Sequence, residues 1–178
     1  MNQFGETYTL GRARGRKLLR FRLWVLLAAP LAAILSQVYV PLFFSPFTLF
    51  DLPLLVTVYF AVMRRSPMFG IFAGAGIGLV QDALSQQPLG MFGMVKTVVG
   101  FIAASVSVRF DVERAPVRFT LACLFFLLHH FAYAGLAHWL LGQAGEAEFG
   151  RALLMAFLNA LVAVPLFHLL DRLKKDED

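Results

Sequence analysis

The chain has 178 residues, of which 59% are hydrophobic and only 15% are charged. This composition is too apolar for an ordinary soluble domain and indicates an integral membrane protein. The formal net charge of +5 does not indicate a nucleic-acid partner, because the basic residues gather at the ends of apolar segments. The single cysteine, Cys123, excludes a disulfide framework or a thiolate metal cluster within the chain.

Six apolar segments follow one another, and each has roughly the length that a helix needs to cross a bilayer. We expect helices, because a backbone in lipid must satisfy its own hydrogen bonds. The predicted fold is therefore all-α, a polytopic membrane protein with one domain over residues 1–178. Its spans are expected at 23–44, 48–63, 68–84, 89–108, 118–141 and 150–170. The second and third are short and interrupted by Pro53 and by glycines, so tilted, broken or partly re-entrant helices are alternatives there.

The basic residues predict the orientation of the chain. Fourteen of the 16 Arg and Lys residues lie in the segment 1–22, beside the connections after the second and fourth expected spans, or in the tail 171–178. Because cytoplasmic segments carry an excess of Arg and Lys, both ends are expected in the cytoplasm, N-in and C-in. The segment 1–22 superficially resembles the start of a signal peptide, but the apolar run 23–44 is longer than such peptides carry. We therefore interpret 1–22 as a basic cytoplasmic anchor before the first span.

Three glycines at four-residue steps, Gly70, Gly74 and Gly78, form a ladder that continues to Asp82. Four-residue steps keep residues on one helix face, so the glycines predict a flat surface that another helix can approach closely. One interpretation is helix packing without a functional site. The other is a groove or a break, which Gly76 favours because it lies off the ladder and adds flexibility.

Three ionisable residues lie within or beside these apolar segments: Asp51, Asp82 and Lys96. Asp51 comes shortly before Pro53, as a helix-capping carboxylate comes before a proline in the first turn. Asp82 is expected either to cap the adjoining connection or to pair, with Lys96 or with polar groups of a partner protein. Lys96 in turn either pairs or snorkels to the external surface. In the predicted topology all three lie toward the external side, so a single polar cluster is the alternative.

Small residues also recur around Pro30, as Ala28 with Ala32 and as Ala29 with Ala33. Pairs at this spacing let helices approach closely. The first interpretation is packing within the chain, and the second is an exposed docking face for another protein.

The chain is predicted to be non-enzymatic, with no catalytic residue, cofactor or metal. No two of its four histidines stand four residues apart, which is the spacing of zinc ligands on a helix, so we interpret them as packing residues. The glycine-rich stretch 74–78 holds no serine that could act as an intramembrane nucleophile. The histidines are His129, His130, His138 and His168.

The segments 50–55, 70–74 and 78–82, followed by Leu89-Gly90 and Gly100, together resemble the rod shape-determining protein MreD family. Size, basic N-terminus and number of helices agree with that family over nearly the whole chain. The resemblance implies a six-helix fold similar to that of the substrate-binding subunits of energy-coupling-factor vitamin transporters. The candidate structural or partner-binding residues are Asp51, Gly70, Gly74, Gly78, Asp82, Gly90 and Lys96.

The function that the resemblance implies is that of a non-catalytic component of the bacterial cell-elongation machinery, in the inner membrane. Its expected direct partner, besides membrane lipid, is an MreC-like scaffold protein. Through that scaffold it would reach an MreB-like filament, a RodA-type glycosyltransferase and a class B penicillin-binding transpeptidase, and so support lateral peptidoglycan synthesis. The alternative is a vitamin-binding subunit of an energy-coupling-factor transporter, in which the polar cluster would hold a small solute.

Overall fold

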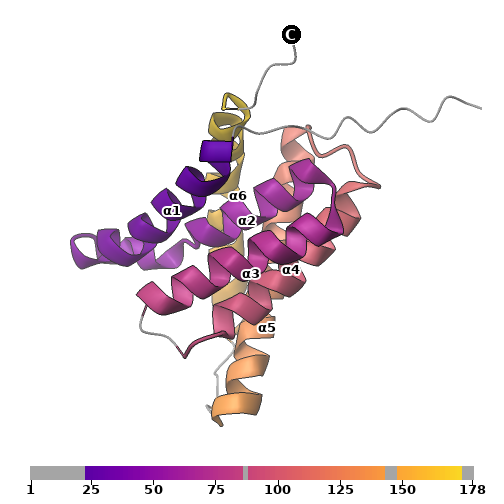
Figure 1. The fold of residues 1–178 in the computed structure, drawn as a ribbon. Coiled ribbons are helices and arrows are strands. Elements are labelled where there is room, and N and C mark those ends of the chain that lie inside the picture. Colours follow the sequence, from indigo (N-terminus) through magenta and orange to yellow (C-terminus); the bar gives the residue numbers. More distant parts are fainter. Residues whose placement is uncertain (1–22, 86–87, 143–147, 174–178) are drawn as a thin grey trace, which may run out of the picture.

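The computed structural model describes residues 23–85, 88–142 and 148–173, and within them all regular structure is helical (Figure 1). An all-helical chain was expected, and this is confirmed for the described residues. The expected basic anchor 1–22 and the end of the expected tail, 174–178, lie outside them. In chain order the elements are α1 (Leu23–Tyr39), the 3₁₀ helices η1 (Val40–Leu42) and η2 (Ser45–Leu49), α2 (Leu52–Arg64), α3 (Pro67–Leu84), α4 (Met91–Ser107), α5 (Ala115–Leu141) and α6 (Phe149–Asp171).

Five helical stretches of the described chain are long and apolar enough to cross a membrane. They are Trp24–Leu42, Ser45–Arg64, Pro67–Leu84, Ala115–Leu141 and Phe149–Asp171. The remaining expected span, the fourth at 89–108, corresponds to α4, which is also apolar but has only 17 residues. At 1.5 Å of rise per residue α4 covers about 25 Å, somewhat less than a hydrocarbon core of about 30 Å.

Helix α2 forms the centre of the molecule. Every residue from Pro53 to Met63 is buried. The helix begins at a capping carboxylate, with Pro53 in its first turn, and ends at Arg65, whose φ of 50° is left-handed. Within the expected second span 48–63, Phe50 and Asp51 are non-helical and separate η2 from α2, so the alternative of a broken helix holds there, just before Pro53. Pro53 itself lies in the first turn of α2, where a helix needs no backbone donor, and α3 is continuous through its glycines.

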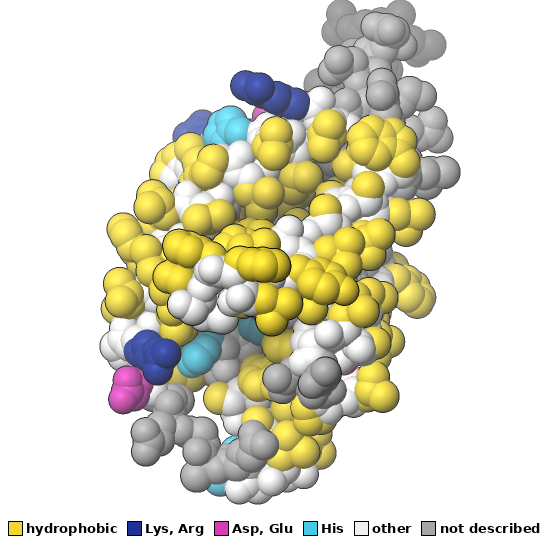
Figure 2. Space-filling view, turned by 90° about the vertical axis from the view of Figure 1, so that its left-hand side faces the viewer, with side chains coloured by type: hydrophobic (Ala, Val, Ile, Leu, Met, Phe, Trp, Pro, Cys, Tyr) yellow, Lys and Arg dark blue, Asp and Glu magenta, His cyan; other side chains and the backbone are white. Residues whose placement is uncertain are grey.

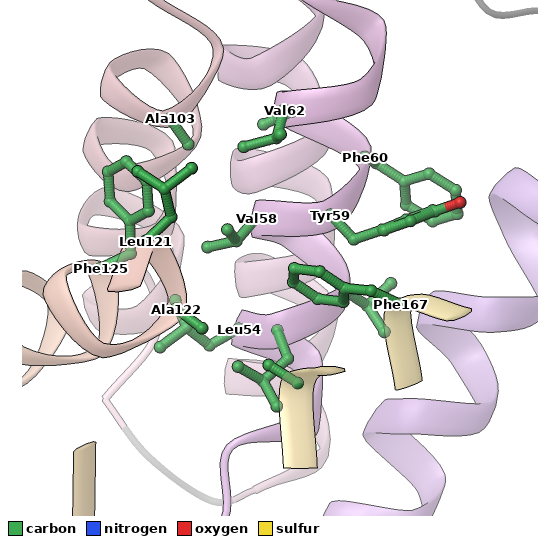
Figure 3. Packing of buried hydrophobic residues seen from close by; sticks show 14 of the residues in the cluster. Leu54, Val58, Tyr59, Phe60, Val62, Ala103, Leu121, Ala122, Phe125 and Phe167 are labelled. Atoms are coloured by element: carbon green, nitrogen blue, oxygen red, sulfur yellow. The ribbon is translucent and has the colours of Figure 1, made fainter. Parts of the chain in front are cut away.

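The apolar core surrounds α2 on several sides (Figure 3). Val58 points toward Ala122 and Phe125 of α5, while Tyr59 points the other way, toward Phe167 of α6. The Tyr59 and Phe167 rings lie 5.3 Å apart between centroids. Alanines on α4 and α6 belong to the same core, and their small, completely buried side chains let neighbouring helices pack closely: Ala103, Ala104, Ala156, Ala160 and Ala163.

Candidate functional site

The glycine ladder packs α3 directly against the backbone of α4. A Cβ atom added at Gly70 would overlap the carbonyl oxygen of Gly100, and one added at Gly74 would overlap that of Lys96. A Cβ atom at Gly78 would lie 2.6 Å from the Cα atom of Gly93. The contact therefore has no room for a side chain, and the packing interpretation of the ladder holds. The same face of α3 cannot also receive a partner helix.

Asp82 closes the end of this contact by capping α4. One carboxylate oxygen accepts hydrogen bonds from the N–H groups of Gly90 and Gly93, and the other accepts one from Phe92, all at 3.0 Å. Gly90 has a φ of 97°, a left-handed conformation that suits glycine. A buried carboxylate at a helix N-terminus satisfies free N–H groups and interacts favourably with the helix dipole. Of the two expectations for Asp82, capping is therefore confirmed.

Lys96 pairs with Asp51 and is completely buried. Its Nζ atom lies 3.1 Å from both carboxylate oxygens of Asp51, so the ion pair joins α4 to the start of α2. The predictions of snorkelling and of a pair with Asp82 were both wrong. Asp51 also accepts a hydrogen bond from the N–H of Leu54 at 2.9 Å, which confirms it as the N-cap of α2. The carboxylate of Asp51 thus caps the start of α2 and also binds α4 through Lys96.

Two further residues, His129 and Asn159, lie beside this ion pair. We call the four residues Asp51, Lys96, His129 and Asn159 the Asp51 cluster. The Asn159 side chain accepts a hydrogen bond from the Asp51 N–H at 2.8 Å and donates one to the carbonyl of Leu49 at 2.8 Å. The Nδ1 atom of His129 lies 3.7 Å from the Asp51 carboxylate. Neither residue was predicted as part of a site. Asn159 could have been found, because it is the only strongly polar residue inside the last apolar segment.

A second buried network, the Arg118 cluster, joins α2, α5 and α6 and comprises Tyr59, Arg118 and Asp171. Arg118 donates to the Asp171 carboxylate at 2.6 Å and to the carbonyl of Val112 at 3.0 Å. The Tyr59 hydroxyl donates to the other Asp171 oxygen at 2.9 Å. Arg118 was expected at the edge of a span, but α5 begins earlier, at Ala115, and Arg118 is 4% exposed.

An apolar groove remains open between α1 and α3, with a volume of about 540 Å³. We call it the α1–α3 groove. Leu27 and Leu31 line it from α1, Phe72 and Gly76 from α3, and Phe60 of α2 also lines it. A Cβ atom at Gly76 would meet nothing within 4 Å. Gly76 therefore borders open space, unlike the three glycines of the ladder. The groove lies on this second face of α3 and not on the ladder face, where it was expected.

The alanine pairs of α1 divide between the two interpretations. Ala33 is buried and Ala29 is half-buried, so this pair packs within the chain. Ala28 and Ala32 are exposed, so this pair leaves small residues on the surface. One face of α1 is therefore used inside the protein, and the other is open to a neighbour.

The chemistry of these groups points to binding and structure. Asp51 and Lys96 neutralise each other, and Asp82 uses its oxygens on backbone donors. Among the described residues, no three His, Cys, Asp or Glu side chains lie together as a metal site would require. The buried charges thus hold helices in place, and none of them lines the α1–α3 groove.

Comparison with protein-family models gives a match over most of the chain. The family model for the rod shape-determining protein MreD matches residues 16–174. No curated protein and no solved structure matches the chain. The matched range includes every helix from α1 to α6.

Proposed function

Because the chain belongs to the MreD family of rod shape-determining proteins, we propose that it is a non-catalytic component of the machinery that elongates bacterial cells. Family membership supports a role in rod shape determination, and the long apolar helices make it a membrane protein. Within that role the chain would act by binding and recruiting other proteins. It would thereby support lateral peptidoglycan synthesis without catalysing a reaction itself.

The arrangement in the membrane is part of the proposal. The chain forms one domain of the inner membrane with six spans, of which α4 is the fourth, and has the fold type of energy-coupling-factor substrate-binding subunits. The glycine contact between α3 and α4 supports a spanning α4. It extends along α3 from the contact of Gly78 with Gly93 to that of Gly70 with Gly100, and α3 is itself long and apolar enough to cross a membrane. The start of α1 and the end of α6 lie at the same end of the molecule in Figure 1. This agrees with both termini in the cytoplasm, as the basic residues predict.

The proposed direct partner is an MreC-like scaffold protein, and the proposed docking site is the α1–α3 groove. The observation that carries this proposal is an apolar groove at membrane depth, which no described part of the chain fills. Leu27 is 75% exposed, Phe72 is 69% exposed and Leu31 is 50% exposed, so large side chains flank the groove. The face on the side of α1 is largely apolar (Figure 2). In lipid, helices associate by close packing, which the exposed Gly76 in this groove favours.

The other candidate residues have a structural role in this proposal. The ladder Gly70, Gly74 and Gly78 fixes α3 on α4, and Asp82 with Gly90 fixes the start of α4. The pair of Asp51 and Lys96 then holds α4 on α2. These residues keep α3 at the position in which its other face forms one wall of the groove. Through the scaffold protein the chain would reach the MreB-like filament, the RodA-type glycosyltransferase and the class B penicillin-binding transpeptidase.

Co-purification of the chain with an MreC-like protein in mild detergent tests the proposal. Wild type should retain the scaffold protein, and Gly76→Phe, which fills the groove, should lose it. Gly135→Phe on α5 is a matched control, because a Cβ atom there also meets nothing within 4 Å and Gly135 lies outside the groove. Equal recovery of the scaffold protein by wild type and both variants would refute docking in the groove.

A further inference from the structure

A polar cavity of about 330 Å³ lies next to the Asp51 cluster. It shares no lining residue with the apolar α1–α3 groove. Asp51, Gln81 and His129 line it, together with the rings of Phe92 and Tyr133. These two rings are stacked, with centroids 4.9 Å apart. Thr48 of η2, which is exposed, also lines the cavity, so the cavity reaches the surface. The cavity thus combines an aromatic wall with buried polar groups.

Two buried polar atoms in this lining have no hydrogen-bond partner among the described residues. They are Oε1 of Gln81 and Nε2 of His129. Gln81 is 3% exposed and His129 is 6% exposed, so both side chains are almost completely buried. A buried polar atom without a partner is destabilising, and native proteins satisfy nearly all such atoms with protein, water or ligand. Both atoms therefore point to a molecule that occupies the cavity.

Both atoms act as hydrogen-bond acceptors, so a bound molecule must supply donors. Oε1 of Gln81 is an amide acceptor. Nδ1 of His129 is the ring nitrogen nearest the Asp51 carboxylate, at 3.7 Å, so the tautomer protonated at Nδ1 suits this contact and presents Nε2 as an acceptor. Two acceptors disfavour an anion at this depth. The Asp51 carboxylate is matched by Lys96, so no uncompensated negative charge awaits a cation.

A second cavity adjoins the first and adds one charged group of each sign. It has a volume of about 270 Å³, is lined by Arg151 and Glu148 among others, and shares His130 and Met155 with the first. Arg151 and Glu148 are exposed at the start of α6. Figure 2 shows a basic and an acidic side chain near a histidine low on an otherwise largely apolar face. A guanidinium next to the polar cavity suits a phosphate that carries a neutral, donor-rich group.

We propose that the polar cavity binds a neutral polyhydroxyl group, presented by the headgroup of phosphatidylglycerol. The glycerol hydroxyls donate to Oε1 of Gln81 and Nε2 of His129, and the carbon atoms of the glycerol pack on the ring of Phe92 or Tyr133. The lipid phosphate lies at Arg151. Free glycerol offers the same hydroxyl chemistry without the phosphate, so the two sources differ in their need for Arg151.

Native mass spectrometry of the full chain tests this site with equal amounts of phosphatidylglycerol, phosphatidylethanolamine and phosphatidylcholine. The first carries a neutral diol, the second an ammonium and the third no donor. Wild type should bind phosphatidylglycerol in about fivefold excess over the other two, the scale expected for one or two hydrogen bonds to buried acceptors. Gln81→Met and His129→Phe should abolish the preference. His168→Phe, which changes an exposed histidine outside both cavities, should keep it.

A second measurement separates the sources and guards against misfolding. Gln81→Met removes an acceptor that has no protein partner, so its melting temperature without added lipid should equal or exceed that of wild type. Arg151→Gln should lose the preference for phosphatidylglycerol. If free glycerol raises the melting temperature of wild type and Arg151→Gln but not of Gln81→Met, the cavity binds the polyol from either source. A well-folded Gln81→Met that keeps the lipid preference, or a wild type with no headgroup preference and no response to glycerol, would overturn the proposal.

Discussion

The two faces of α3 carry the same residue type and behave in opposite ways. On one face Gly70, Gly74 and Gly78 touch the backbone of α4, where not even a methyl group fits. On the other face Gly76 borders a groove of about 540 Å³ against α1. The comparison teaches that a glycine in a membrane helix has no fixed meaning. Its role depends on whether a neighbouring helix has already occupied its face.

The closed face is also the one that buried charge supports. Asp82 caps α4 at one end of the contact, and Lys96 ties α4 to Asp51 at the start of α2. The open face is lined almost entirely by apolar side chains of α1, α2 and α3. In our account the first face builds the protein, and the second receives the partner.

The largest effect should come from Lys96→Met, which breaks the anchor of the closed face. The Asp51 carboxylate would stay buried without its partner, and the free energy of unfolding should fall by about 3–5 kcal/mol. Arg114→Met is the control, because it breaks an ion pair whose side chains are 74% and 57% exposed, where about 0.5 kcal/mol or less is expected. Denaturant unfolding in detergent measures both. A double variant with Asp51→Asn should recover part of the loss, since asparagine also caps helices; no recovery would mean that the ion pair is not the cause.

Gly74→Ala should have the next largest effect. The new methyl group would overlap the backbone of Lys96, so α3 and α4 must separate, and the free energy of unfolding should fall by about 3 kcal/mol. Chemical cross-linking between cysteines placed on α3 and α4 offers a second readout, since the helices should no longer reach each other at wild-type distance. An unchanged unfolding curve would show that the contact can relax.

Asp82→Ala removes the cap of α4 and leaves three backbone N–H groups unsatisfied. A loss of about 2 kcal/mol in unfolding free energy is expected, with Asp82→Asn closer to wild type because an amide oxygen still accepts. Hydrogen exchange of the amides of Gly90, Phe92 and Gly93 should accelerate in Asp82→Ala. Protection that equals wild type at these three amides would refute the capping role.

Gly76→Ala should have the smallest effect and the opposite sign. Its methyl group meets nothing, and alanine favours a helix over glycine, so the free energy of unfolding should rise by about 0.5–1 kcal/mol. The same substitution two residues apart on α3 thus stabilises at Gly76 and destabilises at Gly74. If both variants lose stability, the groove at Gly76 is filled in the folded protein, and the contrast between the two faces fails.

Much of the fold follows from local pattern. Runs of apolar residues predicted the helices to within a few residues, and four-residue spacing put the glycines on one face. The capping roles of Asp51 and Asp82 follow from carboxylates beside helix starts. For Asp82 the helix is the next one along the chain, so the cap lies only a few residues away in sequence.

The site depended on contacts that local pattern does not contain. Asp51 and Asp82 both lie toward the same end of the helix bundle as Lys96. Only the crossing of α2 and α4 decides which carboxylate Lys96 meets. The same applies to Asn159, whose partners Asp51 and Leu49 are more than a hundred residues away. Arg118 was expected at the edge of a span because its partner Asp171 lies at the far end of the chain. Long-range partner choice is therefore what the sequence pattern left undecided.

Site-specific photo-crosslinking in rod-shaped cells tests the central claim most directly. A photoreactive residue at Leu31, on the α1 side of the groove, should form an adduct with the MreC-like scaffold protein. The same residue at Leu161, on α6 and similarly exposed at 57%, should not. An adduct with the scaffold protein from Leu161 and none from Leu31 would contradict docking on the open side of α3.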